Sequence, residues 1–143
     1  KLAKLGPDLL NQYISFKEFK EIIMRYSLKN ICKVLMEQSI FSGIGNYLKS
    51  EILYESKIHP LTTVNNLTES KLRDLYQSSR RLIKASYLSQ GNSLRHYKNV
   101  DSKKGSFQFK LKVYGKKKDP YGNKITRLIT PDGRSTYFVD NIN

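Results

Sequence analysis

Cysteine and histidine are scarce in this chain: its 143 residues include one cysteine, Cys32, and two histidines, His59 and His96. A single cysteine excludes an internal disulfide, which is typical of proteins from a reducing compartment. A structural zinc site needs four nitrogen or sulfur ligands, usually in closely spaced pairs, so this chain cannot build one. Cys32 lies in an apolar run, where we expect a buried thiol rather than a nucleophile.

Acidic residues are also few, and no apolar run is long enough to cross a membrane. The 12 Asp and Glu stand against 26 Lys and Arg, which gives a net charge of +14 and a pI near 9.9. No basic stretch carries the long apolar face of a membrane-surface helix, and the start has no secretory signal pattern. The charge excess predicts a polyanionic partner, with nucleic acid first.

Four helices are predicted in the first two thirds of the chain by apolar side chains at helical spacing. Ser15 is the expected N-cap of the first helix, and Leu28 is expected to face inward from the second. The predicted ranges are 15–25, 28–38, 46–58 and 68–88.

The last third of the chain differs from the rest in composition and in hydrophobic periodicity. Residues 89–106 are rich in Gly, Ser, Asn and Lys, and they predict a flexible loop. Residues 107–113 alternate between apolar and polar, which is the period of a half-buried strand. Two further strands are predicted near 124–130 and 134–139, joined across Pro131-Asp132-Gly133. The pattern therefore predicts an α+β fold, a mainly helical domain followed by a small antiparallel β-hairpin module.

The segment QSIFSGIGNYLKSEIL, residues 38–53, carries two glycines just before a helix. Gly43 and Gly45 flank Ile44, and a residue without a Cβ lets the backbone come close to a ligand. The N-terminus of the helix that begins at Asn46 adds free N–H donors and a partial positive charge, which suit a phosphate. Asn46 can cap that helix or turn its amide toward the phosphate. An ordinary corner between two helices is the alternative.

The string GIGNYLKSEIL followed by IHP closely resembles the helix–two-turn–helix of the formamidopyrimidine-DNA glycosylase and endonuclease VIII family. LGPD, QGNSLRHY and FQFKLKVYG are similar to family sequence in the same order, so the resemblance spans the chain. It implies an interdomain linker at 1–14, a helix–two-turn–helix DNA-binding domain at 15–106 and a finger module at 107–143. It also implies that Asn46 and the backbone of Gly43 to Gly45 hold phosphates beside a lesion.

The terminal hairpin departs from the pattern of most family members, in which two Cys-x-x-Cys pairs bind zinc. The matching positions are Tyr121, Lys124, Val139 and Ile142, which cannot form a zinc site, so we expect no metal and no other cofactor. This departure resembles the zincless finger of the endonuclease VIII-like branch. We expect Tyr121, Val139 and Ile142 to pack across the hairpin in place of the metal. Docking against the helices is expected to supply the remaining stability.

Other candidate contacts follow from the same resemblance. Arg134 matches the finger arginine that grips phosphate near the flipped nucleotide, a role that suits a planar guanidinium. Lys116 and Lys117 are candidate phosphate contacts or simply solvated lysines. Segment 89–106 aligns with the loop that covers the everted base, so Arg95 and Tyr97 are candidate lesion contacts or ordinary exposed residues.

The resemblance implies a function in base excision repair. Family members remove an oxidised base and cut the strand, with the N-terminal residue of the mature enzyme, commonly proline, as nucleophile. This chain begins at Lys1 with nothing similar, so we expect the C-terminal part of a bifunctional DNA glycosylase and abasic-site lyase. The catalytic N-terminal domain is expected to be missing, with no catalytic residue and no activity in this chain alone. The expected partner is double-stranded DNA with a damaged base or an abasic site, bound inside the cell by a monomer.

Two alternatives remain open. One is a non-enzymatic RNA-binding module, because a similar helix–two-turn–helix occurs in a small-subunit ribosomal protein; the hairpin with GRST and FQFKLKVYG argues against it. The other is a protein that binds abasic sites without cutting. The zincless finger favours oxidised pyrimidines, whereas LRHY and FQFKLKVYG occur equally in the branch that prefers oxidised purines, so the lesion class stays open.

Overall fold

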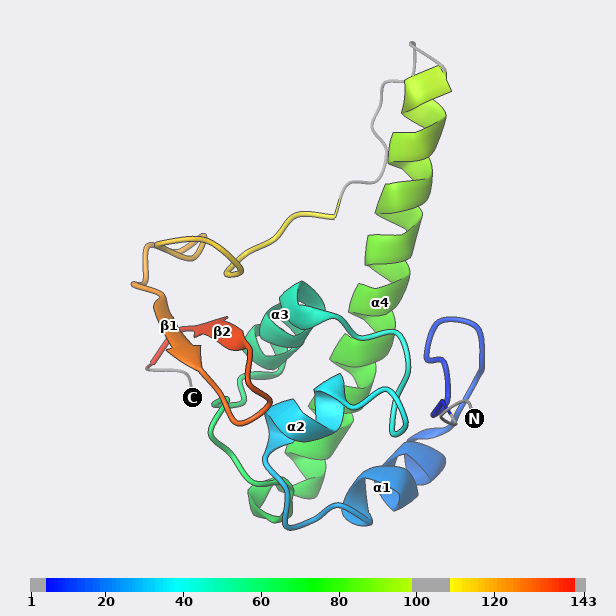
Figure 1. The fold of residues 1–143 in the computed structure, drawn as a ribbon, viewed down its shortest axis with the longest axis vertical. Helices are drawn as coiled ribbons and strands as arrows, with labels where there is room; N and C mark the ends of the chain where they lie inside the picture. Colours follow the sequence, from blue (N-terminus) through cyan, green and yellow to red (C-terminus); the bar gives the residue numbers. More distant parts are fainter. Residues whose placement is uncertain (1–4, 99–108, 141–143) are drawn as a thin grey trace.

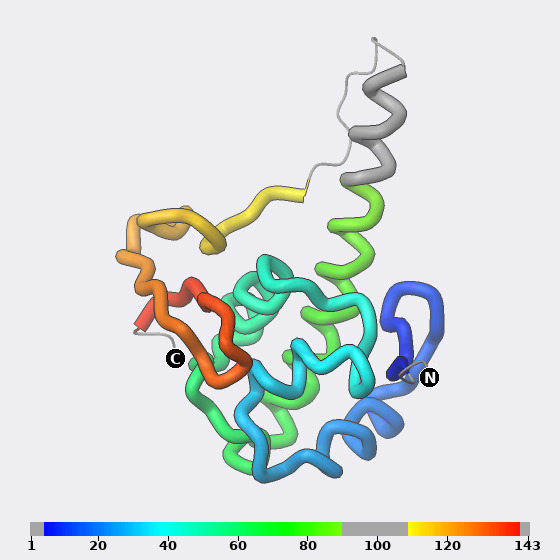
Figure 2. The backbone as a smooth tube through the Cα atoms, in the orientation of Figure 1, coloured from blue at the N-terminus to red at the C-terminus, as the bar shows by residue number. Residues whose placement is uncertain are grey.

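The computed structural model describes residues 5–98 and 109–140, with the side chains of 5–89 and 109–140. A helical body carries a small hairpin on one side, and the N-terminal segment lies on the opposite side of that body (Figures 1 and 2). The elements in chain order are α1 (Phe16–Met24), α2 (Ile31–Met36), α3 (Asn46–Ser56), the 3-10 helix η1 (Val64–Asn66), α4 (Glu69–Lys98), β1 (Thr126–Ile129) and β2 (Ser135–Phe138). The predicted α+β class is confirmed.

The first two helices begin where side chains cap them. Ser15 and Glu18 form a capping box at the start of α1, as the sequence predicts for Ser15. Asn30 caps α2 by accepting the N–H groups of Cys32 and Lys33, so that helix starts at Ile31 and not near residue 28. The prediction for Leu28 is therefore wrong: it precedes the helix and is 83% exposed.

Helix α4 continues ten residues past its predicted end near Leu88 and reaches Lys98 (Figure 1). The flexible loop predicted from residue 89 is thus wrong for residues 89–98, while residues 99–106 lie outside the described part of the chain. Extending an existing helix costs much less than nucleating one, so a polar, glycine-containing stretch can continue it.

Most of the apolar core lies among the helices, where α3 packs against α4 and α1 packs against α4. Cys32 is fully buried in this core and donates to the Pro60 carbonyl oxygen at 3.4 Å, as expected for a core thiol. Burial raises the pKa of its thiol to about 11. A much smaller core of Val113, Ile125 and Val139 holds the hairpin module together.

The hairpin is a two-stranded antiparallel sheet in which Thr126 pairs with Phe138 and Ile129 with Ser135. These strands confirm the two predicted near 124–130 and 134–139. The strand predicted over 107–113 is wrong for its described part, residues 109–113, which contains no strand. The N–H groups of Lys112 and Val113 are instead bound by the carboxylate of Glu51 on α3.

The N-terminal segment lies directly on the loop between α2 and α3. The Gly6 N–H donates to the Gln38 carbonyl oxygen at 2.8 Å, and the Ser42 N–H donates to the Pro7 carbonyl oxygen at 3.0 Å. The contact is so close that a Cβ on Gly6 would stand 2.1 Å from the carbonyl oxygen of Ile40. This segment therefore helps to shape the corner that leads into α3.

Candidate nucleic-acid interface

The corner that precedes α3, residues 38–45, is built around two glycines and one glutamine. Gly43 has a φ of 100°, a conformation that favours glycine. The Gln38 side chain spans the corner, because its Oε1 accepts the Gly43 N–H at 2.9 Å and its Nε2 donates to the Ile44 carbonyl oxygen at 3.1 Å. Ile44 itself is buried, so only its backbone can take part in an interface.

Gly45 is the N-cap of α3 and supplies no side chain to accept the first N–H groups of the helix. A Cβ at Gly45 would meet nothing within 4 Å, so the approach to the helix end is open. Open first-turn donors and the positive end of the helix dipole are the features that bind a phosphate. The geometry of the corner therefore suits the anion-binding role that its sequence suggests.

Asn46 does not cap α3, which corrects one of its two expected roles. It is the first helical residue, and its Nδ2 donates to the Ser135 carbonyl oxygen at 3.1 Å. Its Oδ1 is buried and has no hydrogen-bond partner within the described residues. The contact joins the start of α3 to the start of β2, directly beside Arg134.

Arg134 is exposed at the end of a tight turn, in which the Gly133 N–H donates to the Thr130 carbonyl oxygen at 2.8 Å. The turn is fixed to α3 by an ion pair between Lys49 Nζ and Asp132 Oδ2 at 2.7 Å. Lys49 is fully buried in the structure, and the Asp132 side chain is only 4% exposed. The exposed guanidinium thus stands on an anchored turn.

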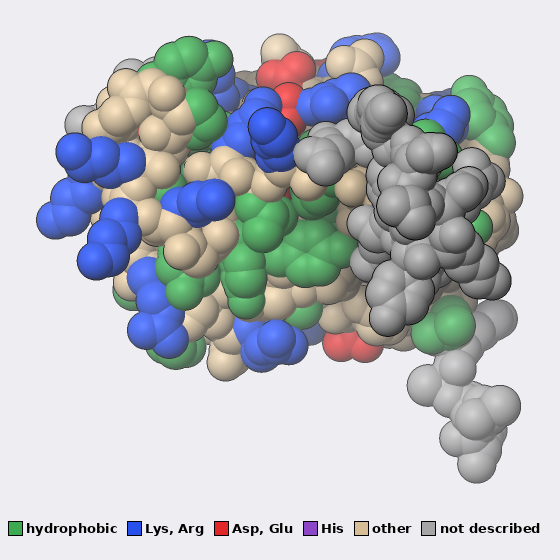
Figure 3. All heavy atoms as spheres, turned by 90° about the horizontal axis from the view of Figure 1, so that it is seen from above, with side chains coloured by type: hydrophobic (Ala, Val, Ile, Leu, Met, Phe, Trp, Pro, Cys, Tyr) green, Lys and Arg blue, Asp and Glu red, His purple; other side chains and the backbone are tan. Residues whose placement is uncertain are grey.

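Lys116 and Lys117 are exposed in the loop that leads into the hairpin. Sequence reasoning missed Arg127, an exposed residue of β1 whose Nε donates to the Ser135 Oγ at 3.1 Å. Seen from above, basic side chains lie to the left of, above and below a central apolar patch (Figure 3). The exposed basic residues of the hairpin module are Lys110, Lys112, Lys116, Lys117, Lys118, Lys124, Arg127 and Arg134.

The acidic residues of the module do little to cancel that charge, because two of its three described carboxylates are buried in contacts. Asp132 is paired with Lys49, and Asp119 accepts hydrogen bonds from its own loop. Asp140 remains exposed and accepts from the Thr126 hydroxyl. The surface of the module is consequently strongly positive.

Helix α3 holds the hairpin with a polar seam that sequence reasoning missed, defined here as Asn46, Lys49, Ser50, Glu51 and Tyr54. The carboxylate of Glu51 accepts the backbone N–H groups of residues 112, 113 and 114 at 2.8 to 3.0 Å. The Ser50 hydroxyl accepts the Tyr137 N–H at 3.1 Å. Lys49, Ser50 and Glu51 are all buried. Consecutive polar residues in a helix ordinarily predict a solvated face, so no local signal indicated this role.

The loop that carries Tyr121 and Lys124, the two positions matched to the first expected zinc pair, is organised by Asp119. Its carboxylate accepts the N–H groups of Tyr121 and Asn123, the Asn123 amide, and the Tyr54 hydroxyl at 2.9 Å. Burial works to raise the pKa of Asp119, but these hydrogen bonds outweigh it and leave the pKa below its ordinary value. Burial and the bond to Asp119 raise the pKa of Tyr54 to about 12.

Three residues are expected to pack across the hairpin in place of a metal, and the structure describes two of them. One of these two is packed as expected. Val139 is buried, but Tyr121 is 84% exposed, so its predicted packing is wrong. Lys124 is exposed, and Ile142 lies outside the described residues. Within the described ranges no three His, Cys, Asp or Glu side chains come together as metal ligands.

Arg95 and Tyr97 both lie on the last turns of α4 and not in a loop. Their side chains lie outside the described part of the structure, so their predicted contacts with a lesion stay predictions. Tyr47, Phe109 and Tyr114 line a groove together with Ser86, Ser89 and Leu111. The Tyr47 ring lies 6.3 Å from each of the other two rings.

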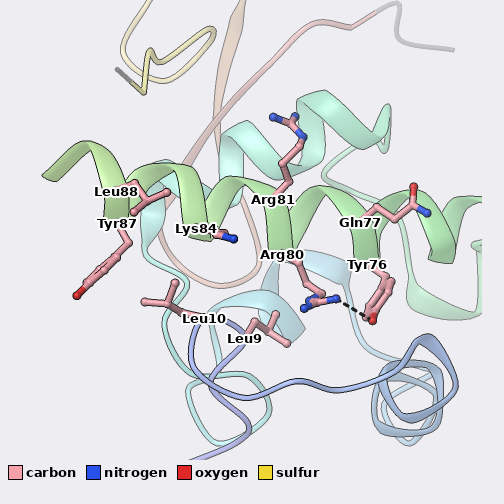
Figure 4. A pocket seen from close by; sticks show the side chains of 9 residues that line it. All are labelled: Leu9, Leu10, Tyr76, Gln77, Arg80, Arg81, Lys84, Tyr87 and Leu88. Atoms are coloured by element: carbon pink, nitrogen blue, oxygen red, sulfur yellow. Dashed lines mark hydrogen bonds between the residues drawn. The ribbon is translucent and has the colours of Figure 1, made fainter. Parts of the chain in front are cut away.

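A second pocket, of about 480 Å³, lies where the N-terminal segment meets α4 (Figure 4). Arg80 points into it and donates to the Tyr76 hydroxyl at 3.2 Å, whereas Arg81 points away toward α3 and pairs with Glu55. Its lining residues are Leu9, Leu10, Tyr76, Gln77, Arg80, Arg81, Lys84, Tyr87 and Leu88. In the described helices, no segment has both the length and the apolar character of a membrane span.

Comparison with known proteins assigns this architecture. A family model described as the formamidopyrimidine-DNA glycosylase H2TH domain, where H2TH denotes helix–two-turn–helix, matches residues 5–98. The formamidopyrimidine-DNA glycosylase of Heliobacterium modesticaldum is 34% identical over 139 residues, which are 95% of this chain and 50% of that protein. The enzyme of Listeria monocytogenes is 31% identical over 142 residues, 98% of this chain and 52% of that protein. The chain thus spans about half the length of these relatives.

Solved structures agree with this comparison. The Lactococcus lactis formamidopyrimidine-DNA glycosylase, bound non-covalently to DNA that contains an abasic site, superposes with a TM-score of 0.76 at 30% identity, over 96% of this chain and 49% of that one. A viral DNA glycosylase gives a TM-score of 0.74 at 29% identity, over 92% of this chain and 47% of that one. The chain belongs to the formamidopyrimidine-DNA glycosylase H2TH-domain family.

Proposed function

We propose that this chain is the damaged-DNA-binding C-terminal part of a bifunctional DNA glycosylase and abasic-site lyase that acts on oxidised bases. Its partner is duplex DNA with a damaged base or an abasic site, which it binds as a monomer inside the cell. The nucleophile belongs to an N-terminal catalytic domain outside the 143 residues, so the chain alone performs no chemistry.

One observation supports this proposal above the others. The Asn46 amide joins the open N-terminus of α3 to the backbone of Ser135, next to the exposed Arg134. Two different phosphate-binding devices, a helix end and a guanidinium, thereby lie on one surface. Separate phosphates of one bent strand are the ligand that such a pair suits.

The remaining roles follow from this placement. Gly43, Ile44, Gly45 and Asn46 present backbone and amide groups to the phosphates, and Lys116 and Lys117 add long-range attraction. Arg95 and Tyr97, on the last turns of α4, are proposed to approach the everted base. The finger works without zinc, because Asp119 and the polar seam of α3 fasten it.

The Lactococcus lactis relative has been solved with a formamidopyrimidine lesion and also with an oxidised pyrimidine in its DNA. Two functions compete with this proposal: an RNA-binding module, and a protein that binds abasic sites without cutting. Binding to abasic duplex and to structured RNA distinguishes the proposal from the RNA-binding module.

The test is fluorescence anisotropy of the chain on a duplex with a stable abasic analogue, on the undamaged duplex and on a structured RNA, at two salt concentrations. We expect the abasic duplex to bind tightest, and Arg134→Ala to weaken that binding about tenfold. The matched control is Lys17→Ala, which removes one exposed positive charge from α1. Equal or tighter binding to RNA, unaffected by Arg134→Ala, would overturn the proposal.

A further inference from the structure

We propose that Lys49 and Asp132 are positioning residues for DNA binding, whose buried ion pair sets the place of Arg134 relative to the N-terminus of α3. This inference rests on the proposed function and deepens it. It assigns a role to Lys49, whose side chain is fully buried. The described basic residues of the hairpin module, by contrast, are exposed.

The two ends of the ion pair stand close to the two proposed phosphate contacts. Lys49 lies three residues after Asn46, within the first turn of α3, and Asp132 lies two residues before Arg134. Nζ and Oδ2 are 2.7 Å apart, with both side chains out of solvent. An ion pair at this distance and burial allows little relative movement of the two segments.

Thr130 connects the ion pair to Arg134, because it contacts both Asp132 and the backbone of Arg134. The Thr130 hydroxyl lies between the Asp132 carboxylate and the carbonyl oxygen of Arg134, 3.0 Å from the latter, and it can donate to either. The Thr130 N–H also donates to the Arg134 carbonyl oxygen at 3.1 Å. The backbone of Arg134 is therefore bonded to the residue that contacts Asp132.

A second tie holds the other side of Arg134. The Ser135 carbonyl oxygen accepts from Asn46, so α3 contacts the turn both before and after the arginine. Both ties come from the first turn of the same helix. Arg134 is thus bracketed by contacts to the element that offers the other phosphate site.

Energetics favour positioning over simple stabilisation as the role of the pair. Burying two charges costs desolvation that their attraction offsets only in part, so a neutral pair of similar size often leaves a protein equally stable. What a neutral pair lacks is a directional contact that holds one geometry. Loss of the pair should therefore reduce the contribution of Arg134 to binding while the chain stays folded.

The experiment is a double-mutant cycle on the 143-residue chain, with dissociation constants for the abasic-analogue duplex. The proteins are wild type, Asp132→Asn, Arg134→Ala and the double variant. The same cycle is run with Lys49→Met/Asp132→Asn in place of Asp132→Asn, because this neutral pair keeps the fold if a lone buried lysine does not. Thermal melting by circular dichroism verifies that each variant is folded at the binding temperature. Asp140→Asn, which removes an exposed carboxylate from the same hairpin, is the matched control for charge.

We expect Asp132→Asn to weaken binding about tenfold although it removes a negative charge, and Arg134→Ala to cost nothing more in either altered background. Asp140→Asn should leave binding unchanged or tighten it. The positioning role would be overturned if the fold-changes of the single variants simply multiply in the double variant. It would also be overturned if Asp132→Asn had the same effect as Asp140→Asn. Either result would leave the proposed function intact. Absence of any preference for the abasic duplex in the wild type would instead remove the proposed function.

Discussion

The carboxylate of Glu51 accepts the backbone N–H of Val113 at 3.0 Å, and the same oxygen accepts that of Tyr114 at 2.8 Å. A single side chain of α3 thus takes the place of a neighbouring strand for this segment. We expect Glu51→Gln to destabilise the chain by about 3 kcal/mol, because an amide offers one acceptor atom and leaves buried donors unpaired. Urea unfolding followed by circular dichroism measures this loss. Glu55→Gln, which breaks a solvent-exposed pair with Arg81, should cost less than about 1 kcal/mol; similar losses for both variants would contradict the assignment.

The hairpin should loosen in acid because of Asp119. Hydrogen bonds hold the pKa of this carboxyl below its ordinary value of 3.8, so its contribution to stability is complete above pH 3.8 and is lost as pH falls through the lower folded value. The free energy of unfolding is measured between about pH 2 and 6 for the wild type and for Asp119→Asn. Over about pH 2 to 4, where carboxyls titrate, it should decline less steeply for Asp119→Asn than for the wild type. Parallel curves would show that Asp119 does not titrate in the folded state as described.

Gly6 should tolerate no side chain. A Cβ there would overlap the Ile40 carbonyl oxygen at 2.1 Å, and that atom belongs to backbone. We predict that Gly6→Ala lowers the free energy of unfolding by about 2–3 kcal/mol, a cost typical of overpacking. Differential scanning calorimetry provides the measurement. A melting temperature equal to that of the wild type would show that the N-terminal segment is not bound to the corner in solution.

Gly45 offers the opposite case. The space beside it is open, so Gly45→Ala should cost the fold about 1 kcal/mol or less, as expected for alanine at an N-cap. Binding to the abasic duplex should fall about tenfold, because the new methyl group stands where a phosphate would approach the helix end. Anisotropy and melting curves on the same samples separate the two effects. Unchanged binding would remove this helix end from the interface.

The chain alone should form no covalent intermediate. A Schiff base requires a neutral amine placed against the sugar C1′, and an ordinary exposed lysine is an ammonium ion at neutral pH. Borohydride treatment of the chain with a duplex that contains an aldehydic abasic site should therefore give no adduct above the background of a reduced-site duplex. A trapped complex in high yield would contradict the proposal that the catalytic groups lie elsewhere.

Sequence reasoning predicted the helices and the hairpin strands because each has a local cause. Ser15 is followed three residues later by Glu18, which defines a capping box, and Pro131-Asp132-Gly133 defines the turn between the strands. The motif resemblance likewise indicated the corner at Gly43 to Asn46 without knowledge of the fold.

Other errors and omissions have a different cause, namely partners distant in the chain. Segment 109–113 alternates like a strand, but its Lys112 and Val113 N–H groups meet the carboxylate of Glu51, 61 and 62 positions earlier. From the sequence alone Lys49 is expected at the surface. In the structure it is buried against Asp132, which lies 83 positions later in the chain. Tyr121 is expected to pack because the resemblance matches it to a zinc-ligand position, yet its loop is organised by hydrogen bonds to Asp119. No periodicity reports such pairings.

The polar seam of α3 attaches the hairpin through groups that peroxide does not oxidise. Carboxylate, ammonium, amide and hydroxyl groups are not substrates for the peroxide chemistry that converts thiolates to sulfenic acids and disulfides. The one thiol of the chain, Cys32, is buried with its pKa raised to about 11, so it presents almost no thiolate to an oxidant. The proposed DNA-binding side of this molecule should consequently keep its shape under the same oxidative conditions that generate damaged bases.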